Sequence, residues 1–418
     1  MSPRRSTLSL FAASVLVLAH SLPALAAAGV LDSSFGVAGQ VTTNLGPGFD
    51  AAFAMTVQDD GKTVAVGKTS GAGGRFALVR YLDDGSLDSS FGGDGKVMTN
   101  LSPAGDWANA VAIQDDGKIV VAGRASGGGG RFALVRYHAN GTLDSSFGGD
   151  GKVLTNLSPG EDEAFGVAVR SSDDTIVAGG FVDEGIHAKF GVVTYHANGT
   201  LDSSFGGDGK VTTDLTTKSD GVYGVAIQPA DGKIVVAGAA SDKFALARYE
   251  SDGSLDTTFS GNGTARPDFT NGKDYARAVA VEAGSGAIVA AGSAGNANFA
   301  LVRYTSAGAP DATFSGNGKT VTSFTNGHDY ARGLALQGDG GIVAAGIADG
   351  TKFAVARYDV DGSRDLTFSG NGKAVAEFTA GVDGAYGVGI QPADGKIVLA
   401  GVAGGANKKF ALARYLGA

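Results

Sequence analysis

A strand–turn–strand unit that recurs seven times constrains this chain more than any other feature of its sequence. In the second copy, an apolar run from Ala110 to Gln114 leads to a turn at Asp116-Gly117, and a second apolar run follows from Ile119 to Gly123. Two apolar runs separated by an Asp-Gly turn are typical of a β-hairpin. The copies begin near Phe53, Ala110, Gly166, Gly224, Ala278, Gly333 and Gly387. The sequence therefore predicts a tandem array of one unit.

Two further markers fix the period of the array. One is Leu-Asp-Ser-Ser-Phe with its variants, and the spacings between its aspartates are 56, 56, 58, 54, 55 and 54 residues. These aspartates are Asp32, Asp88, Asp144, Asp202, Asp256, Asp311 and Asp365. The other marker is Phe-Ala-Leu-Val-Arg-Tyr, which alternates large and small residues as a strand does. It begins at Phe76, Phe132, Phe190, Phe244, Phe299, Phe353 and Phe410. A Val/Thr-rich segment such as 97–101 completes each unit with a fourth strand.

Four short antiparallel strands in each of seven units predict an all-β fold, a single seven-bladed β-propeller over residues 27–418. The hairpin strand that carries Gly166, Gly224, Gly333 and Gly387 is expected innermost, because small side chains suit the crowded axis. The Ile-Val-Val-Ala-Gly strand is expected second, and the Phe-Ala-Leu-Val-Arg-Tyr strand third. The more polar Val/Thr-rich strand is expected outermost, where one edge meets water.

The phase of the repeats predicts how the ring closes. An outer-type strand, Gln40 to Leu45, precedes the first inner strand, and the chain ends on a third-type strand, Phe410 to Tyr415. Inner and outer strands balance only if the N-terminal strand completes the last blade. We therefore expect a hydrogen-bonded clasp between the two ends of the chain.

Residues 1–26 are expected to be a secretory signal rather than part of the fold. Arg4 and Arg5 precede a mostly apolar run from Leu8 to Ala19, and Ala24-Leu25-Ala26 is a small-x-small cleavage pattern. A membrane anchor is the alternative, but the run is short, and no later stretch could span a bilayer. We expect export to the periplasm or the extracellular space, and a monomer there.

Composition excludes several classes of function. The net charge is −9 with no basic tract, which argues against a nucleic-acid partner. The chain has no cysteine, so disulfides, thiolate catalysis and cysteine metal sites are excluded. A chain of this length can bury enough core to manage without disulfides.

The repeat resembles a known family. Asp-Gly-Lys-Ile-Val-Val-Ala-Gly, Phe-Ala-Leu-Ala-Arg-Tyr and Asp-Gly-Ser-Leu-Asp-Thr-Thr-Phe, as they stand from Asp231 to Phe259, are similar to the delta-60 repeat, and more loosely to NHL-type repeats. The delta-60 resemblance covers essentially the whole chain after residue 26. It implies a bacterial, often exported β-propeller with no established activity, and it supplies no catalytic residues.

An aspartate stands eight residues before the last residue of each inner strand: Asp50, Asp106, Asp162, Asp220, Asp274, Asp329 and Asp383. The predicted strand order places these carboxylates on one face, around the axis. Such a ring could bind a hard cation such as calcium or attract a cationic ligand. The alternative, which we favour, is that each carboxylate accepts N–H bonds from its own loop. No other cofactor is predicted.

The residues three places further on vary far more: Phe53, Asn109, Phe165, Tyr223, Arg277, Arg332 and Tyr386. If the mouth of the axis binds a ligand, this mixed aromatic and arginine set is expected to confer selectivity, with Tyr223, Arg277, Arg332 and Tyr386 as candidate contacts. The longest loop, Phe181 to Lys189, is a second candidate contact surface.

Six of the seven third strands carry an arginine, and Thr194 is the exception. We expect each arginine to pair with the aspartate of a Leu-Asp-x-x-Phe motif and tie a blade to its connection. Asp256 is one such aspartate. This pairing is expected to be structural rather than functional.

Catalytic residues cannot be assigned. The sequence contains no His-Glu-x-x-His and no Gly-x-Ser-x-Gly motif. Because the repeats are nearly equal, a non-enzymatic binding or scaffold module is favoured, with a protein or a saccharide as its partner. The alternative is a carbohydrate-active hydrolase or lyase that uses carboxylates at the axis mouth.

Overall fold

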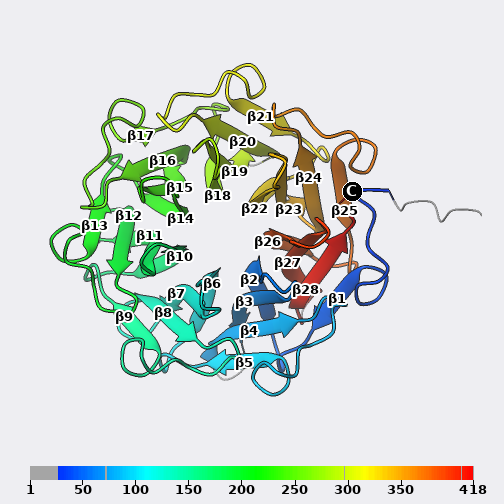
Figure 1. Cartoon of the computed structure of the whole chain (residues 1–418), viewed down its shortest axis with the longest axis horizontal. Coiled ribbons are helices and arrows are strands. Elements are labelled where there is room, and N and C mark those ends of the chain that lie inside the picture. The colour runs from blue at the N-terminus through cyan, green and yellow to red at the C-terminus, as the bar shows by residue number, and fades with distance from the viewer. Residues whose placement is uncertain (1–26, 71–72, 296, 406, 418) are drawn as a thin grey trace, which may run out of the picture.

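Seven four-stranded antiparallel sheets surround a central axis in the computed structural model of the chain (Figure 1). The structure describes residues 27–70, 73–295, 297–405 and 407–417; the predicted signal, residues 1–26, lies outside them. The predicted seven-bladed, all-β propeller is confirmed. Among the described residues, no helix has the length and apolar character to cross a bilayer.

Each blade begins with an inner strand, followed by the second strand of the predicted hairpin. The inner strands are β2 (Asp50–Val57), β6 (Asp106–Ile113), β10 (Asp162–Arg170), β14 (Asp220–Ile227), β18 (Tyr275–Val281), β22 (Tyr330–Leu336) and β26 (Gly384–Ile390). The second strands are β3 (Thr63–Thr69), β7 (Ile119–Ala125), β11 (Thr175–Asp183), β15 (Ile234–Ala240), β19 (Ile288–Ala294), β23 (Ile342–Ala348) and β27 (Ile397–Ala403). We number the blades 1 to 7 in this order.

The third and outer strands follow in the predicted order. The third strands are β4 (Arg75–Tyr81), β8 (Arg131–Tyr137), β12 (Ala188–Tyr195), β16 (Lys243–Tyr249), β20 (Asn298–Tyr304), β24 (Lys352–Tyr358) and β28 (Lys409–Tyr415). The outer strands are β5 (Lys96–Thr99), β9 (Lys152–Thr155), β13 (Lys210–Thr213), β17 (Thr264–Ala265), β21 (Lys319–Thr322), β25 (Lys373–Ala376) and β1 (Gln40–Thr43). Only two residues of β17 pair, since Pro267 follows close behind and has no N–H to donate.

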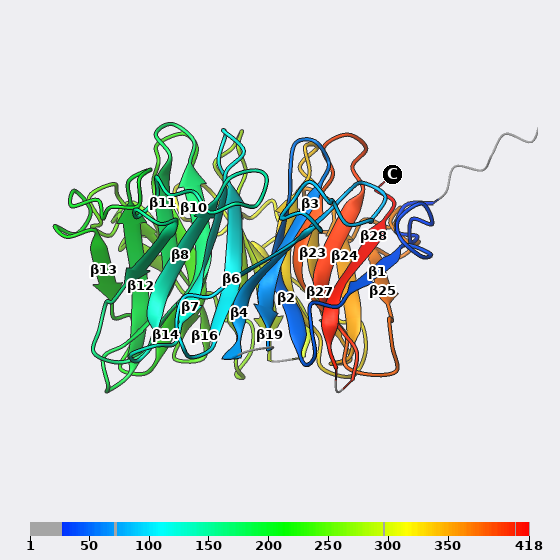
Figure 2. The same cartoon turned by 90° about the horizontal axis from the view of Figure 1, so that it is seen from below.

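The two ends of the chain build blade 7 together, as predicted. Its strand order is β1-β28-β27-β26, and β1 pairs with β28 from Gln40↔Ala413 to Thr43↔Phe410. Figure 2 shows β1 lying alongside β28. The strand ends at Thr43 rather than at the predicted Leu45, because the Leu45 amide donates to the Asp50 carboxylate instead (2.8 Å).

Small residues allow the inner strands to crowd around the axis. A Cβ added to Gly224 would lie 3.0 Å from the backbone nitrogen of Val279 in the next blade. A Cβ on Gly166 would lie 2.8 Å from a methyl carbon of Val225. The prediction of a small-residue inner strand is therefore confirmed, and its cause is the close approach of neighbouring blades.

The hydrophobic core lies between the blades. Each seam has its own cluster of buried residues; in the seam of blades 1 and 2, for example, Val64, Val66 and Leu78 pack with Ile119 and Val121. Hydrogen bonds reinforce the seams, since Tyr137 of blade 2 donates to Thr99 of blade 1 (2.7 Å). The interblade packing makes one rigid ring from seven small sheets.

The predicted arginine–aspartate pairs are present, and each arginine also contacts the next blade, which was not expected. Arg248 Nε lies 2.6 Å from Asp256 Oδ2, and its Nη1 donates to the carbonyl of Ser306 in the next blade. The guanidinium also lies 4.9 Å from the ring centroid of Phe259. Each such arginine therefore ties its own turn to the neighbouring blade.

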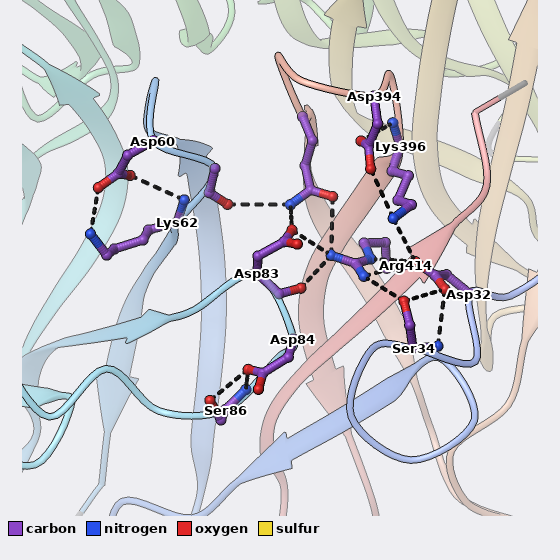
Figure 3. Close-up of polar contacts among 12 residues, drawn as sticks. Asp32, Ser34, Asp60, Lys62, Asp83, Asp84, Ser86, Asp394, Lys396 and Arg414 are labelled. Carbon is purple, nitrogen blue, oxygen red and sulfur yellow. Dashed lines mark hydrogen bonds and ion pairs between the residues drawn. The ribbon is translucent and has the colours of Figure 1, made fainter.

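The arginine–aspartate pair of blade 7 also closes the ring. Figure 3 shows Arg414 between Asp32 and Ser34 on one side and Asp83 of blade 1 on the other. The Arg414 Nη2 lies 2.8 Å from Asp32 Oδ2. Burial alone would raise the pKa of the Asp32 carboxyl, but Ser34, Arg414 and Lys396 together lower it to about 2.

Candidate functional site

Every inner strand contains a β-bulge at the same place. In blade 1, Ala52 pairs with Gly67 and Ala54 pairs with Val66, so Phe53 has no partner on β3. A bulge turns the extra side chain away from the regular alternation of the strand. The bulged residues are Phe53, Asn109, Phe165, Tyr223, Arg277, Arg332 and Tyr386. We call this set the bulge ring; it is the variable set that the sequence analysis identified.

The second strand of each blade accommodates the bulge with a glycine. A Cβ added to Gly67 would lie 1.8 Å from the carbonyl oxygen of Ala51, just before the bulge. The equivalent distances at the other second-strand glycines are 1.8 to 2.0 Å. The glycines compared are Gly123, Gly180, Gly238, Gly292, Gly346 and Gly401. A glycine near the end of the second strand, after Ala, Gly or Val, is therefore the sequence signature of the bulge.

The bulge ring lines one cavity at the axis. Its volume is about 520 Å³, and residues from all seven blades contribute to its wall. Lys68 and Trp107 complete the wall beside the bulged residues. A volume of this size is within the range of small-molecule sites, about 300–1,000 Å³. We call it the axial cavity.

Aromatic rings form two pairs on the wall of the axial cavity. Phe53 and Tyr386, from blades 1 and 7, lie 5.7 Å apart edge to face. Phe165 and Tyr223, from blades 3 and 4, lie 5.4 Å apart in the same geometry. Such pairs stabilise each other while leaving ring faces for a ligand. The pairs join neighbouring blades, because the bulge brings successive rings to one level.

A buried glutamate fixes the blade 2 part of the wall. Glu163 Oε1 accepts from Trp107 Nε1 (2.6 Å) and from Asn109 Nδ2 (2.8 Å). Arg124 Nη1 lies 3.6 Å from its second oxygen. These contacts hold Trp107 and Asn109 in place and occupy the carboxylate.

The charges on the cavity wall are positive. Its charged residues are Lys68, Arg277 and Arg332, and no Asp or Glu is among the described residues that line it. Burial lowers the pKa of Lys68, and burial followed by the neighbouring Arg332 lowers the pKa of Arg277. The axial cavity is therefore cationic, although the whole chain carries a net charge of −9.

The seven inner-strand aspartates do not line the axial cavity. All are at most 2% exposed, and each accepts from the loop before its own inner strand. Asp106, for example, accepts from the Leu101 amide (2.7 Å) and from the Ser102 hydroxyl (2.6 Å). Serine or threonine supplies this hydroxyl in six blades, whereas Gly46 leaves Asp50 Oδ1 without a partner. These contacts are those of turn caps.

Other candidate sites lie apart from the axial cavity. In residues 27–417, wherever the structure describes them, no three His, Cys, Asp or Glu residues come together as metal ligands. Most of the segment Phe181 to Lys189 extends β11 and β12, so a long hairpin replaces the expected long loop. Ile186 at its tip is 91% exposed.

Sequence reasoning identified the bulge ring without its cause. Tyr223, Arg277, Arg332 and Tyr386 do come together at the axis. The aspartates three places earlier do not join them, because the bulge turns one side chain inward and the aspartates stay within their loops. Lys68 and Trp107 were missed, since neither belongs to a repeated pattern. The repeated second-strand glycine could have revealed the bulge.

Comparisons with known proteins support a propeller repeat family. A family model described as a domain of unknown function (DUF5122) beta-propeller matches residues 58–91, 114–147, 230–259, 284–314 and 337–368. Each segment runs from the hairpin turn into or through the Leu-Asp-x-x-Phe type motif. The delta-60 name is not confirmed by this match.

The fold is shared with solved structures. A chain in a crystal structure entitled "Crystal Structure of Mitotic Checkpoint Complex" aligns over 100% of this chain and 99% of its own length, with a TM-score of 0.53. The two chains are 10% identical, so the likeness shows the fold alone. No curated protein matches the chain.

Proposed function

We propose that this protein is an exported, non-enzymatic binding module whose ligand occupies the axial cavity. One observation carries the proposal: seven nearly equal blades each contribute one bulged residue to the same cavity, and these residues differ. Loops and special positions on a rigid scaffold are where recognition usually resides. A purely structural ring would have no need for four kinds of side chain at one position of its repeat.

Binding is better supported than hydrolysis. A glycoside hydrolase needs two carboxyl groups beside the bond that it cleaves. The described residues that line the axial cavity include no carboxylate, and Glu163 behind them is held by Trp107 and Asn109. The alternative of a carbohydrate-active enzyme therefore has less support from the site.

The lone tryptophan makes ligand binding measurable. Trp107 is the only tryptophan in the chain and lies on the wall of the axial cavity. We expect a ligand from a panel of neutral and acidic oligosaccharides and short peptides to change its fluorescence and raise the melting temperature. A ligand at 100 times its Kd adds about 2.7 kcal/mol to stability.

Matched variants locate the site. Phe165→Ala should weaken binding, since the ring faces the cavity, whereas Ile186→Ala at the exposed hairpin tip should leave it unchanged. Binding that survives Phe165→Ala and disappears in Ile186→Ala would place the site on the hairpin. If no compound of the panel binds, the axial cavity is not a binding site for oligosaccharides or short peptides.

Two further parts of the proposal have separate tests. Export rests on residues 1–26, and a purified secreted or periplasmic protein should begin after Ala26; a cytoplasmic chain that keeps these residues would contradict it. The second test concerns calcium at the inner-strand aspartates. Because their carboxylates already accept hydrogen bonds from their own loops, we expect the same melting temperature with calcium and with chelator. A clear rise with calcium would instead identify a metal site.

A further inference from the structure

Two arginines stand side by side in the bulge ring, in blades 5 and 6. The Arg277 guanidinium lies 4.2 Å from the ring centroid of Tyr223, and the Arg332 guanidinium lies 4.7 Å from that of Tyr386. The four residues therefore follow one another around the cavity with aromatic rings at both ends. Stacking orients each guanidinium while leaving N–H groups for other partners.

These arginines differ from the structural arginines of the fold. Arg248 and Arg414 are each paired with a buried aspartate. In the part of the chain that the structure describes, no carboxylate lies within ion-pair distance of Arg277 or Arg332, and Arg332 Nε is buried without an acceptor. Two adjacent cations, one of which has a buried N–H without an acceptor, form a site that an anion would stabilise.

The surroundings of the pair provide space for an anionic group. Arg277 and Arg332 line both the axial cavity and a second, small cavity of about 90 Å³, which Tyr275, Ser293 and Tyr330 help to enclose. Guanidinium groups match the geometry of carboxylate, sulfate and phosphate, since they offer parallel N–H donors. The aromatic pairs on the rest of the wall offer apolar ring faces beside this charge.

We propose that the ligand of the axial cavity is an anionic saccharide, with its carboxylate, sulfate or phosphate group between Arg277 and Arg332. The sugar ring then packs against an aromatic ring of the wall such as Phe165, because aromatic faces suit the C–H faces of a sugar. This inference rests on the proposed binding function and names its ligand class. It explains why an acidic chain has a cationic cavity.

The experiment compares charged and neutral sugars by isothermal titration calorimetry. The probes are trigalacturonate, a sulfated galactose trisaccharide, a phosphorylated one and neutral galactotriose. We expect at least one charged probe to bind at least 10-fold more tightly than galactotriose, and the tightest identifies the oxyanion. Arg277→Gln and Arg332→Gln should each reduce its affinity at least 10-fold, with weaker binding at high salt.

Controls separate charge recognition from folding and from the binding function itself. Arg364→Gln, at an exposed arginine outside the cavity, should leave the affinity unchanged. Ligand-free Arg277→Gln should still unfold in one cooperative transition, since it loses the contact with Tyr223 together with the repulsion from Arg332. Equal binding of charged and neutral sugars, unaffected by Arg277→Gln but lost in Phe165→Ala, would overturn the anion site and leave the binding function intact. Failure of all four sugars would overturn the saccharide proposal. The wider panel then decides whether the cavity binds another class.

Discussion

Gly292 lies against the bulge of β18 and leaves no room for a side chain. An added Cβ would lie 1.8 Å from the Tyr275 carbonyl oxygen. The bulge in β18 or its pairing with β19 must then shift. We expect Gly292→Ala to reduce the free energy of unfolding by about 1–3 kcal/mol, the usual cost of overpacking, as measured by urea denaturation.

Gly284 in the turn of the same hairpin is the matched control. A Cβ there meets nothing within 4 Å, so Gly284→Ala should change stability by less than about 0.5 kcal/mol. If both variants were equally stable, the glycine would not be required by the bulge, and the position of Arg277 in the cavity would need another cause.

At the scale of the strand, β12 departs from the other third strands. Thr194 replaces the arginine, and its hydroxyl is buried without a partner. Asp202 accepts from the amide and the hydroxyl of Ser204 but receives no arginine in the described structure. The seam between blades 3 and 4 therefore lacks the tie that Arg136 makes between blades 2 and 3.

We expect Thr194→Arg to supply this missing tie and to stabilise the protein by about 1–2 kcal/mol. The hydrogen bonds of the new guanidinium should outweigh the cost of burying its charge, because the acceptors already exist. Calorimetric melting measures the gain. Thr194→Met, with volume but no charge, should not reproduce it, and Arg136→Met should cost about 3–5 kcal/mol by leaving Asp144 unpaired. A lower melting temperature for Thr194→Arg would show that this seam has no room for the side chain.

For the whole molecule, Asp32 and Asp202 make a matched pair, because they occupy the same motif position with and without an arginine. Asp32→Asn should cost about 3–5 kcal/mol, since Arg414 is 1% exposed and would keep a buried charge without its main partner. Asp202→Asn should cost much less. Equal costs in urea unfolding would mean that ring closure does not depend on the Arg414 pair.

The same aspartate predicts a pH dependence. Its folded pKa, about 2, lies below the ordinary value of 3.8, so its contribution is complete above about pH 4 and is lost as the pH falls toward 2. Melting temperatures between pH 5 and 2 should therefore fall steeply for the native protein and less steeply for Asp32→Asn. Parallel curves would contradict this linkage.

The fold was largely predictable because it repeats. Each pattern recurs seven times, so the order of the strands and the clasp at Gln40 followed from counting. The site was less predictable because it is made of exceptions to the repeat. Phe53 and Arg277 share a position but no chemistry, and Lys68 and Trp107 occur in one blade each. Cavities depend on such single residues, which periodicity cannot reveal.

The clasp of blade 7 also gives the molecule a route to association. Four residues of β1 hold it to β28, and nothing in those backbone hydrogen bonds requires both strands to belong to one molecule. When β1 detaches, β28 becomes an open edge that fits the β1 of a second copy equally well. At high concentration, reciprocal exchange of these strands would produce a domain-swapped dimer in which every blade is still complete.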